Sequence, residues 1–208
     1  MLKVTEIGFS YGNRNNLFSD ISFQVEKSEV LRIKGVNGKG KSTLLKCLLG
    51  LLSLDSGDVL LEGQSELDYF RKNTEYLSPE ANALFDDMSA CENIESWLSL
   101  RSLKIDRDSI KDALQLWGFS GDYLLEKMPV SQFSTGMKRR LAMARVSLSS
   151  TKLWLLDEPL YGLDKQGVEQ FQELLVKHTS NGGAAIIISH DESIFRDNKA
   201  FTYKELEL

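Results

Sequence analysis

The segment Gly35 to Thr43 has the composition and spacing of a loop that holds phosphate. It reads GVNGKGKST and matches the pattern G-x-x-x-x-G-K-[ST] at Gly35, Gly40, Lys41 and Ser42. Glycines let backbone N–H groups approach phosphate oxygens without obstruction by a Cβ atom. Lys41 would place a cation on the β- and γ-phosphates, and the Ser42 hydroxyl would bind Mg²⁺. A flexible turn is the alternative, but an apolar strand before the loop and a leucine-rich helix after it favour a nucleoside triphosphate site.

A second segment, LWLLDEP, carries two adjacent carboxylates at the end of an apolar strand, Asp157 and Glu158. Neighbouring acids at such a position are costly unless a cation neutralises them, and Mg²⁺ would do so. Asp157 suits a role toward Mg²⁺, and Glu158 suits orienting and deprotonating an attacking water. An exposed acidic turn is the alternative for this segment alone, and its pairing with the phosphate loop makes that alternative weaker.

Two further segments offer polar groups beside these. Ser134 is a good N-cap for the helix that follows it, and Gly136 helps to leave backbone N–H groups free at that helix start, where an anion could bind. Taken alone, an ordinary capped helix explains this segment better. His190 follows the apolar run Ile186-Ile187-Ile188, where a lone histidine is usually a structural hydrogen-bonding residue.

The elements that position these residues alternate between strand and helix patterns. Strands are expected at 2–9, 21–25, 30–34, 58–62, 153–156 and 184–188, and helices at 41–52, 135–148 and 166–178, with a helical segment between 88 and 136. Such alternation implies a mostly parallel sheet with its ligands at the carboxyl ends of the strands.

The bulk composition narrows the function classes. The chain has 208 residues, of which 42% are hydrophobic, and its net charge of −5 argues against a general electrostatic grip on nucleic acid. Cys47 and Cys91 have no metal-ligand spacing, which fits a reducing cytosol. Because no apolar run reaches the length of a membrane span, any membrane role is expected to come through a partner.

These motifs, in this order, resemble the ATP-binding cassette (ABC) family over nearly the whole chain. The resemblance implies an α/β fold, a P-loop NTPase (RecA-like) core with an antiparallel β subdomain and an inserted helical subdomain. It implies one nucleotide-binding domain over 1–208, with 1–79 and 140–208 as core and β subdomain and 80–139 as the helical subdomain. It also implies a second copy of the chain, paired head to tail with two ATP molecules between the copies.

The resemblance extends to single residues. It implies Glu158, His190 and Lys41 as catalytic, and Ser42, Asp157 and Glu80 as Mg²⁺ ligands. Residues expected to contact ATP are Tyr11, Gly35, Asn37, Gly38, Gly40, Lys41, Ser42, Thr43, Ser134, Gly136 and Asp164. Tyr11 stands where the family stacks an aromatic on adenine, although a core or surface tyrosine is its alternative. FSTGM, 133–137, takes the place of the signature that touches the γ-phosphate from the opposite subunit, and YGLD, 161–164, that of the D-loop.

Three departures from the family pattern bear on function. The signature keeps Ser134 and Gly136 but has Phe133, Thr135 and Met137, so ATP binding from the opposite subunit should survive. Glu80 falls at the position of the Q-loop glutamine, where it adds negative charge beside the polyphosphate. From this we expect altered coupling between Mg²⁺ binding and movement of the helical subdomain. Tyr161 replaces a small D-loop residue and could alter dimer packing.

The resemblance implies an ATPase subunit of an ABC transporter that powers a separate integral membrane subunit from the cytoplasmic face. Trp97 and Trp117 could dock that subunit or could fill the core of the helical subdomain. Some segments resemble the ATPase of the heme exporter of cytochrome c maturation, and others resemble small ABC-2-type exporter ATPases. Both indicate export of a substrate that the sequence leaves unidentified. The alternative is a soluble, non-transport ABC ATPase of cofactor assembly, repair or translation.

Overall fold

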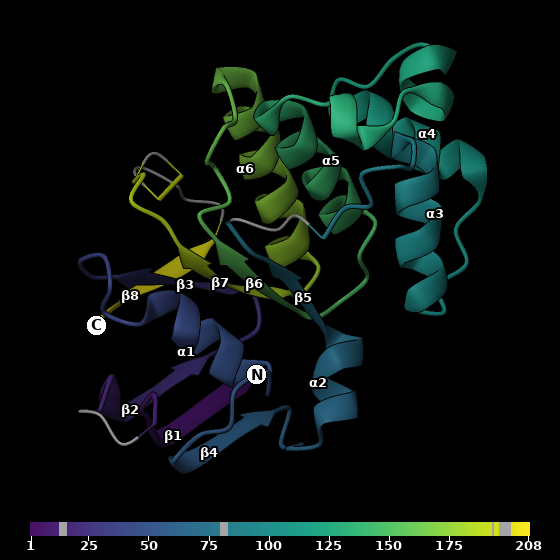
Figure 1. Ribbon diagram of the computed structural model, residues 1–208. Coiled ribbons are helices and arrows are strands. Elements are labelled where there is room, and N and C mark those ends of the chain that lie inside the picture. The colour runs from purple at the N-terminus through teal and green to yellow at the C-terminus, as the bar shows by residue number, and fades with distance from the viewer. Residues whose placement is uncertain (13–15, 80–82, 193, 196–200) are drawn as a thin grey trace. The chain divides into compact units, whose positions relative to one another are not determined.

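A parallel five-stranded sheet with the strand order β5-β6-β7-β3-β8 forms the framework of the protein (Figure 1). The computed structural model describes residues 1–12, 16–79, 83–192, 194–195 and 201–208. The strands of this sheet are β3 (Glu29–Lys34), β5 (Thr74–Leu77), β6 (Leu153–Asp157), β7 (Ala184–Ile188) and β8 (Thr202–Glu207). Strands β6 and β7 are buried at every residue, which is typical of central strands in a parallel sheet.

The register of the central strands brings three chain segments to one edge of the sheet. Asp157 of β6 lies opposite Ile188 of β7, and Ile188 lies opposite Ile33 of β3. Because parallel strands have their carboxyl ends at the same edge, the residues that follow these three positions emerge together. The phosphate loop, Glu158 and His190 are therefore neighbours, although the loop is more than a hundred residues away from the other two in the sequence.

A smaller antiparallel sheet with the order β2-β1-β4 packs against the same core. Its strands are β1 (Leu2–Phe9), β2 (Phe18–Val25) and β4 (Ser56–Leu61). Helix α1 (Lys41–Leu48) lies between the two sheets in Figure 1 and contributes buried leucines to a shared hydrophobic cluster. This cluster anchors the helix that follows the phosphate loop.

The first helix ends earlier than its sequence pattern predicts, and three elements were not predicted. Helix α1 stops at Leu48 rather than at residue 52, because Gly50 adopts a left-handed backbone with φ +66°, a common helix ending. The unpredicted elements are short or on the sheet edge, where the hydrophobic pattern is weak: α2 (Leu67–Asn73), β5 and β8.

Within the described residues, the three α-helices in the helical part of the chain each begin at a side-chain N-cap. The elements of this part are α3 (Ala90–Leu100), α4 (Arg107–Leu116), the single turns η1 (Tyr123–Lys127) and η2 (Val130–Gln132), and α5 (Thr135–Ser147). Ser89 and Glu92 form a capping box at α3, and Asp106 and Ser134 cap α4 and α5. Trp117 is buried and fills the core of this part, whereas Trp97 is half-buried beneath the guanidinium of Arg145. The packing of Trp117 excludes it as a docking residue.

The chain folds as two compact units. The first unit comprises Met1–Ser78, Thr151–Pro159 and Leu175–Leu208, and the second comprises Pro79–Ser150 and Leu160–Leu174. Helix α6 (Lys165–Ser180) begins in the second unit and ends in the first. The division of the sequence at residues 80 and 140 stays a prediction about subdomains.

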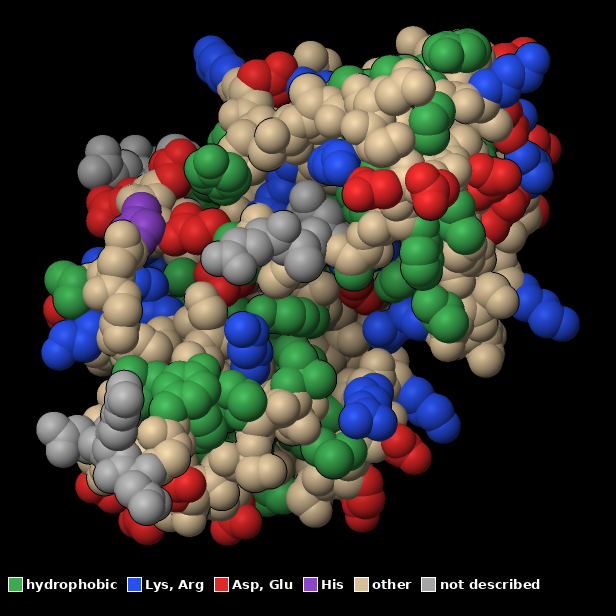
Figure 2. All heavy atoms as spheres, in the orientation of Figure 1, with side chains coloured by type: hydrophobic (Ala, Val, Ile, Leu, Met, Phe, Trp, Pro, Cys, Tyr) green, Lys and Arg blue, Asp and Glu red, His purple; other side chains and the backbone are tan. Residues whose placement is uncertain are grey.

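Helix hydrophobicity and surface charge describe the exterior of the protein. None of the helices in the described residues is long and apolar enough to cross a membrane. On the face drawn in Figure 2, basic and acidic side chains are intermixed, in keeping with the net charge of −5.

Candidate functional site

The phosphate loop connects β3 to α1 and wraps around the side chain of its own lysine. The Lys41 ammonium donates hydrogen bonds to the carbonyls of Gly35, at 2.7 Å, and Val36, at 3.1 Å. Gly40 is the N-cap of α1 with φ +91°, a conformation that side-chain-bearing residues rarely adopt. The loop thus presents a cation and a helix N-terminus at one place, which is the chemistry of an anion site.

Tyr11 and Thr43 meet beside the loop. The Tyr11 hydroxyl lies 3.2 Å from the Thr43 hydroxyl, and the Tyr11 ring packs edge-on against Phe9 with centroids 4.8 Å apart. Tyr11 is nevertheless 54% exposed. The exposed ring is thus tied to the first turn of α1, and its role beside a bound base stays a prediction.

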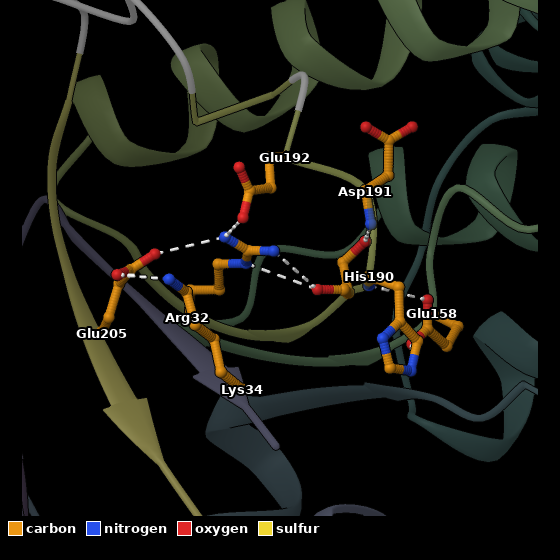
Figure 3. Close-up of polar contacts among 8 residues, drawn as sticks. Arg32, Lys34, Glu158, His190, Asp191, Glu192 and Glu205 are labelled. Carbon is orange, nitrogen blue, oxygen red and sulfur yellow. Dashed lines mark hydrogen bonds and ion pairs between the residues drawn. The ribbon is translucent and has the colours of Figure 1, made fainter. Parts of the chain in front are cut away.

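Glu158 and His190 face one another at the edge of the parallel sheet (Figure 3). The His190 Nε2 atom lies 3.5 Å from Glu158 Oε1 and 3.1 Å from the side-chain oxygen of Asn37 in the phosphate loop. Two backbone bonds tie the same segments together, because Glu158 N donates to Ile188 O at 2.8 Å and His190 N donates to Glu158 Oε2 at 3.4 Å. The structure therefore unites three of the predicted site residues in the first unit.

The environment of Glu158 suits a proton acceptor. Burial raises the pKa of its carboxyl above the ordinary value, while the nearby His190 and its backbone N–H act in the opposite direction. The residue also has φ +46°, an uncommon backbone conformation for a glutamate. A carboxylate with a raised pKa is a stronger base toward the proton of an attacking water.

Asp157 is the last residue of β6 and is 2% exposed. A hydroxyl from Ser42 and a carboxylate from Asp157 are the hard oxygen donors that Mg²⁺ prefers. Among the described residues, no group of three or more His, Cys, Asp or Glu side chains could hold a metal by itself. An ion bound by this pair would take its remaining ligands from phosphate and water, which fits the habit of Mg²⁺ in nucleotide sites.

The signature and D-loop residues lie together within the second unit. The Ser134 hydroxyl accepts a hydrogen bond from Met137 N at 3.2 Å, as the N-cap of α5. A Cβ on Gly136 would come within 3.0 Å of the Gly162 carbonyl, so a larger residue would push the two segments apart. A cavity of about 270 Å³ is lined by Ser134, Gly136, Gly162 and Asp164 among others.

Asp164 is held by contacts within the second unit. Both of its oxygens accept hydrogen bonds from Arg140 Nη2, at 2.6 and 2.7 Å. A hydrogen bond from Gly167 N and the Arg140 charge lower the pKa of this carboxyl. Asp164 caps α6 and joins it to α5, and its predicted contact with ATP stays a prediction.

Comparisons with known proteins decide the family. The sequence profile of the ABC transporter family matches residues 18–161. The chain belongs to the ABC transporter family. It is 35% identical over 185 residues to the cytochrome c biogenesis ATP-binding export protein CcmA of Vibrio cholerae, covering 88% of this chain and 87% of the relative. A CcmA of Nitrosomonas europaea is 36% identical over 184 residues, covering 86% and 84%.

Solved structures agree with this ABC assignment. The ATP-binding cassette MJ0796, described as a dimeric post-hydrolysis state bound to ADP and Pi, superposes with a TM-score of 0.83. It is 20% identical and covers 100% of this chain and 96% of its own, so it establishes the fold. CbiO1 of Clostridium perfringens, part of the ABC transporter complex cbiONQ, is 30% identical with a TM-score of 0.72, covering 93% and 79%.

The protein is therefore an ATP-binding, ATP-hydrolysing subunit of an ABC transporter with a P-loop NTPase fold, as the sequence resemblance implied. The family and these relatives are transporter proteins, which disfavours the alternative of a repair, translation or cofactor-assembly ATPase. Glu80, the predicted Q-loop residue of this ABC ATPase, lies outside the described residues.

Sequence reasoning missed two arginines around the ABC motifs. Arg140 holds Asp164, and Arg32 on β3 contacts the segment that carries His190 (Figure 3). A signal for Arg32 was present, because it stands between the apolar residues Leu31 and Ile33 of an expected strand, and a charged residue buried there requires partners.

Proposed function

We propose that Lys41, Glu158 and His190 carry out ATP hydrolysis on phosphates held by the loop Gly35 to Thr43. The observation that carries this proposal is the meeting of His190 with both Glu158, at 3.5 Å, and Asn37, at 3.1 Å. These contacts support the proposal, because the proposed general base and the proposed partner of the γ-phosphate then lie beside a residue of the phosphate loop. Positioning and electrostatic stabilisation supply most of the catalysis in phosphoryl transfer.

Each residue has a distinct part in the proposed mechanism. Lys41 leaves its two carbonyl partners to neutralise the β- and γ-phosphate oxygens. Glu158 accepts a proton from the water that attacks the γ-phosphate, and its raised pKa favours that transfer. His190 holds Glu158 and Asn37 in place. Ser42 and Asp157 would hold Mg²⁺, which supplies positive charge against the phosphate oxygens.

We further propose that a second copy of the chain completes the site. Ser134 and Gly136 lie at the N-terminus of α5, where the helix dipole and free N–H groups favour an anion. In the proposed dimer this end faces the γ-phosphate bound by the other copy. ATP binding closes the pair, and hydrolysis at Glu158 reopens it.

The likeness to the CcmA proteins supports a role in export. We propose that the chain works on the cytoplasmic face of the cell membrane, attached through an integral membrane subunit. Cytochrome c biogenesis is the favoured process because the identity of 35% extends over 88% of the chain rather than over the ATP motifs alone. Small ABC-2-type exporters remain the second candidate, from the resemblance of FSTGMKRRLAMAR.

The two histidines provide a matched test of the hydrolytic site. His190→Ala should lower ATP turnover by a factor of about 100 or more while ATP binding persists, because it removes a contact near the reacting phosphate. His178→Ala is the control, since His178 stacks on Trp154 with centroids 3.7 Å apart and serves packing. It should lower the melting temperature and leave turnover per folded molecule unchanged. An active His190→Ala variant would remove the catalytic proposal.

The transport process is tested in cells. Deleting the gene should abolish covalent heme in c-type cytochromes, measured by heme staining of separated membrane proteins, and wild-type chain should restore it. A Lys41→Ala copy serves as the control that should fail to restore it. Normal c-type cytochromes in the deletion strain would overturn the biogenesis role and favour the other exporter class.

A further inference from the structure

Arg32 is a buried arginine in the middle of β3, one strand away from the segment that carries His190. The residue is only 4% exposed, and its neighbours in register are Ile187 on β7 and Glu205 on β8. Lysine and arginine are almost never fully buried without partners. The side chain therefore has to satisfy five N–H donors inside the protein.

The partners of Arg32 lie on both sides of His190 in the sequence (Figure 3). Arg32 Nε and Nη2 donate to the carbonyl oxygen of Ser189 at 3.3 and 3.2 Å. Arg32 Nη1 forms an ion pair with Glu192 Oε1 at 3.0 Å. One guanidinium thus holds the residue immediately before His190 and the residue two positions after it.

Arg32 has further contacts outside the segment Ser189 to Glu192. Nη1 also pairs with Glu205 Oε1 on β8 at 3.2 Å, and the guanidinium lies over the ring of Phe195 at 5.1 Å. Glu205 has a second partner, because Lys34 Nζ lies 2.6 Å from its Oε2. The hydrogen bond from Lys34 lowers the pKa of Glu205, which keeps the carboxylate charged.

The peptide group between Ser189 and His190 links Arg32 to the proposed base. Its carbonyl accepts the two bonds from Arg32, and its N–H donates to Glu158 Oε2 at 3.4 Å. Because a peptide group is planar, the carbonyl and the N–H point in opposite directions and turn together. Rotation of this peptide group would direct its carbonyl oxygen at the Glu158 carboxylate. The two bonds from Arg32 oppose that rotation, because they hold the carbonyl on the other side.

We propose that Arg32 is a positioning residue for hydrolysis, which acts through the Ser189–His190 peptide group and Glu192 to hold His190 against Glu158 and Asn37. This inference rests on the proposed function of His190 and Glu158. The competing interpretation is that Arg32 serves folding alone. A comparison of Glu192 with Glu205 separates the positioning role from the folding role. Glu192 belongs to the histidine segment, whereas Glu205 ties the same guanidinium to the sheet edge.

The test measures steady-state ATP turnover and equilibrium ATP binding by the purified full chain. Arg32→Met keeps an unbranched apolar stem and removes the guanidinium with its donors. It should lower kcat at least about tenfold while ATP affinity changes less than about threefold, because the phosphate loop is untouched. Arg32→Lys should have a higher kcat than Arg32→Met. An ammonium can bond to either Ser189 O or Glu192, but it lacks the planar guanidinium that bonds to both.

Glu192→Gln and Glu205→Gln form the matched pair. Each removes one carboxylate charge from Arg32, and only the first should lower kcat, by about three- to tenfold. If Arg32→Met fails to fold, this pair decides alone. Equal kcat for the two variants would overturn the inference, as would an Arg32→Met variant with wild-type kcat.

A double variant separates this inference from the proposed function. If Arg32 acts through His190, Arg32→Met combined with His190→Ala should be no slower than His190→Ala alone, to within about a factor of two. An additional tenfold loss, roughly, in the double variant would show that Arg32 acts elsewhere. An active His190→Ala variant would instead contradict the proposed function itself.

Discussion

The two compact units carry functional residues of different chemical character. In the first unit, the candidate residues are polar or ionisable side chains that contact one another beyond the strand ends, as with Glu158, His190 and Asn37. In the second unit they are a helix N-terminus at Ser134 and an ion pair between Arg140 and Asp164. The first unit therefore holds groups that could move a proton, and the second unit holds a helix N-terminus that could bind an anion.

The largest effect should come from the phosphate loop of the first unit. Lys41→Ala should weaken ATP binding and turnover by a factor of 100 or more, roughly, because a cation directed at the phosphates is lost. Lys39→Ala is a matched control, because Lys39 is an exposed lysine of the same loop. Equilibrium binding of labelled ATP measures both. Similar losses for the two lysines would show that the loop acts only through its overall charge.

A smaller effect should come from the second unit. Ser134→Ala removes a helix cap and the proposed γ-phosphate contact, so turnover should fall about tenfold and stability by about 1 kcal/mol. Ser89→Ala removes the cap of α3 and should lower stability by a similar amount without slowing turnover. Denaturant unfolding and ATPase rates distinguish the two serines. Equal turnover in both variants would leave Ser134 as a cap alone.

A third difference concerns acid stability and separates the two units. Burial lowers the pKa of His178 in the first unit to about 4, so the unfolded chain binds its proton first as the pH falls. The stability from neutral His178 is complete above about pH 6.5 and is lost toward pH 4, by up to about 3 kcal/mol. In the second unit, hydrogen bonds from Arg107 and Lys111 lower the pKa of Glu126 to about 2, so its ion pairs persist.

Hydrogen exchange of peptides from each unit, compared between pH 7 and pH 5, measures this difference. Peptides of the first unit should lose more protection than those of the second. The control is His178→Phe, which keeps a ring on Trp154 and should remove most of the pH dependence. Equal loss in both units would contradict the assignment of acid sensitivity to His178.

The structure brings several of the predicted site residues together, whereas the contacts that support them were not predicted. Strands with strong apolar runs, such as β6 and β7, were expected nearly at their observed ends, and the phosphate loop was predicted from its spacing together with the strand before it and the helix after it. Edge elements such as β8 were missed because their residues are mostly exposed and lack an apolar face. The partners of Arg32 and Arg140 were not predicted, because nothing in a single sequence pairs an arginine with a particular carbonyl or carboxylate many residues away.

Glu158→Gln tests the central proposal most directly, because it removes the proposed base and keeps the size of the side chain. In the presence of Mg²⁺ and ATP, the purified variant should retain ATP, elute from size-exclusion chromatography at the mass of a dimer, and hydrolyse ATP at least about 100 times more slowly than wild type. A Glu158→Gln variant that stays monomeric and hydrolyses ATP at the wild-type rate would contradict both the base and the shared site.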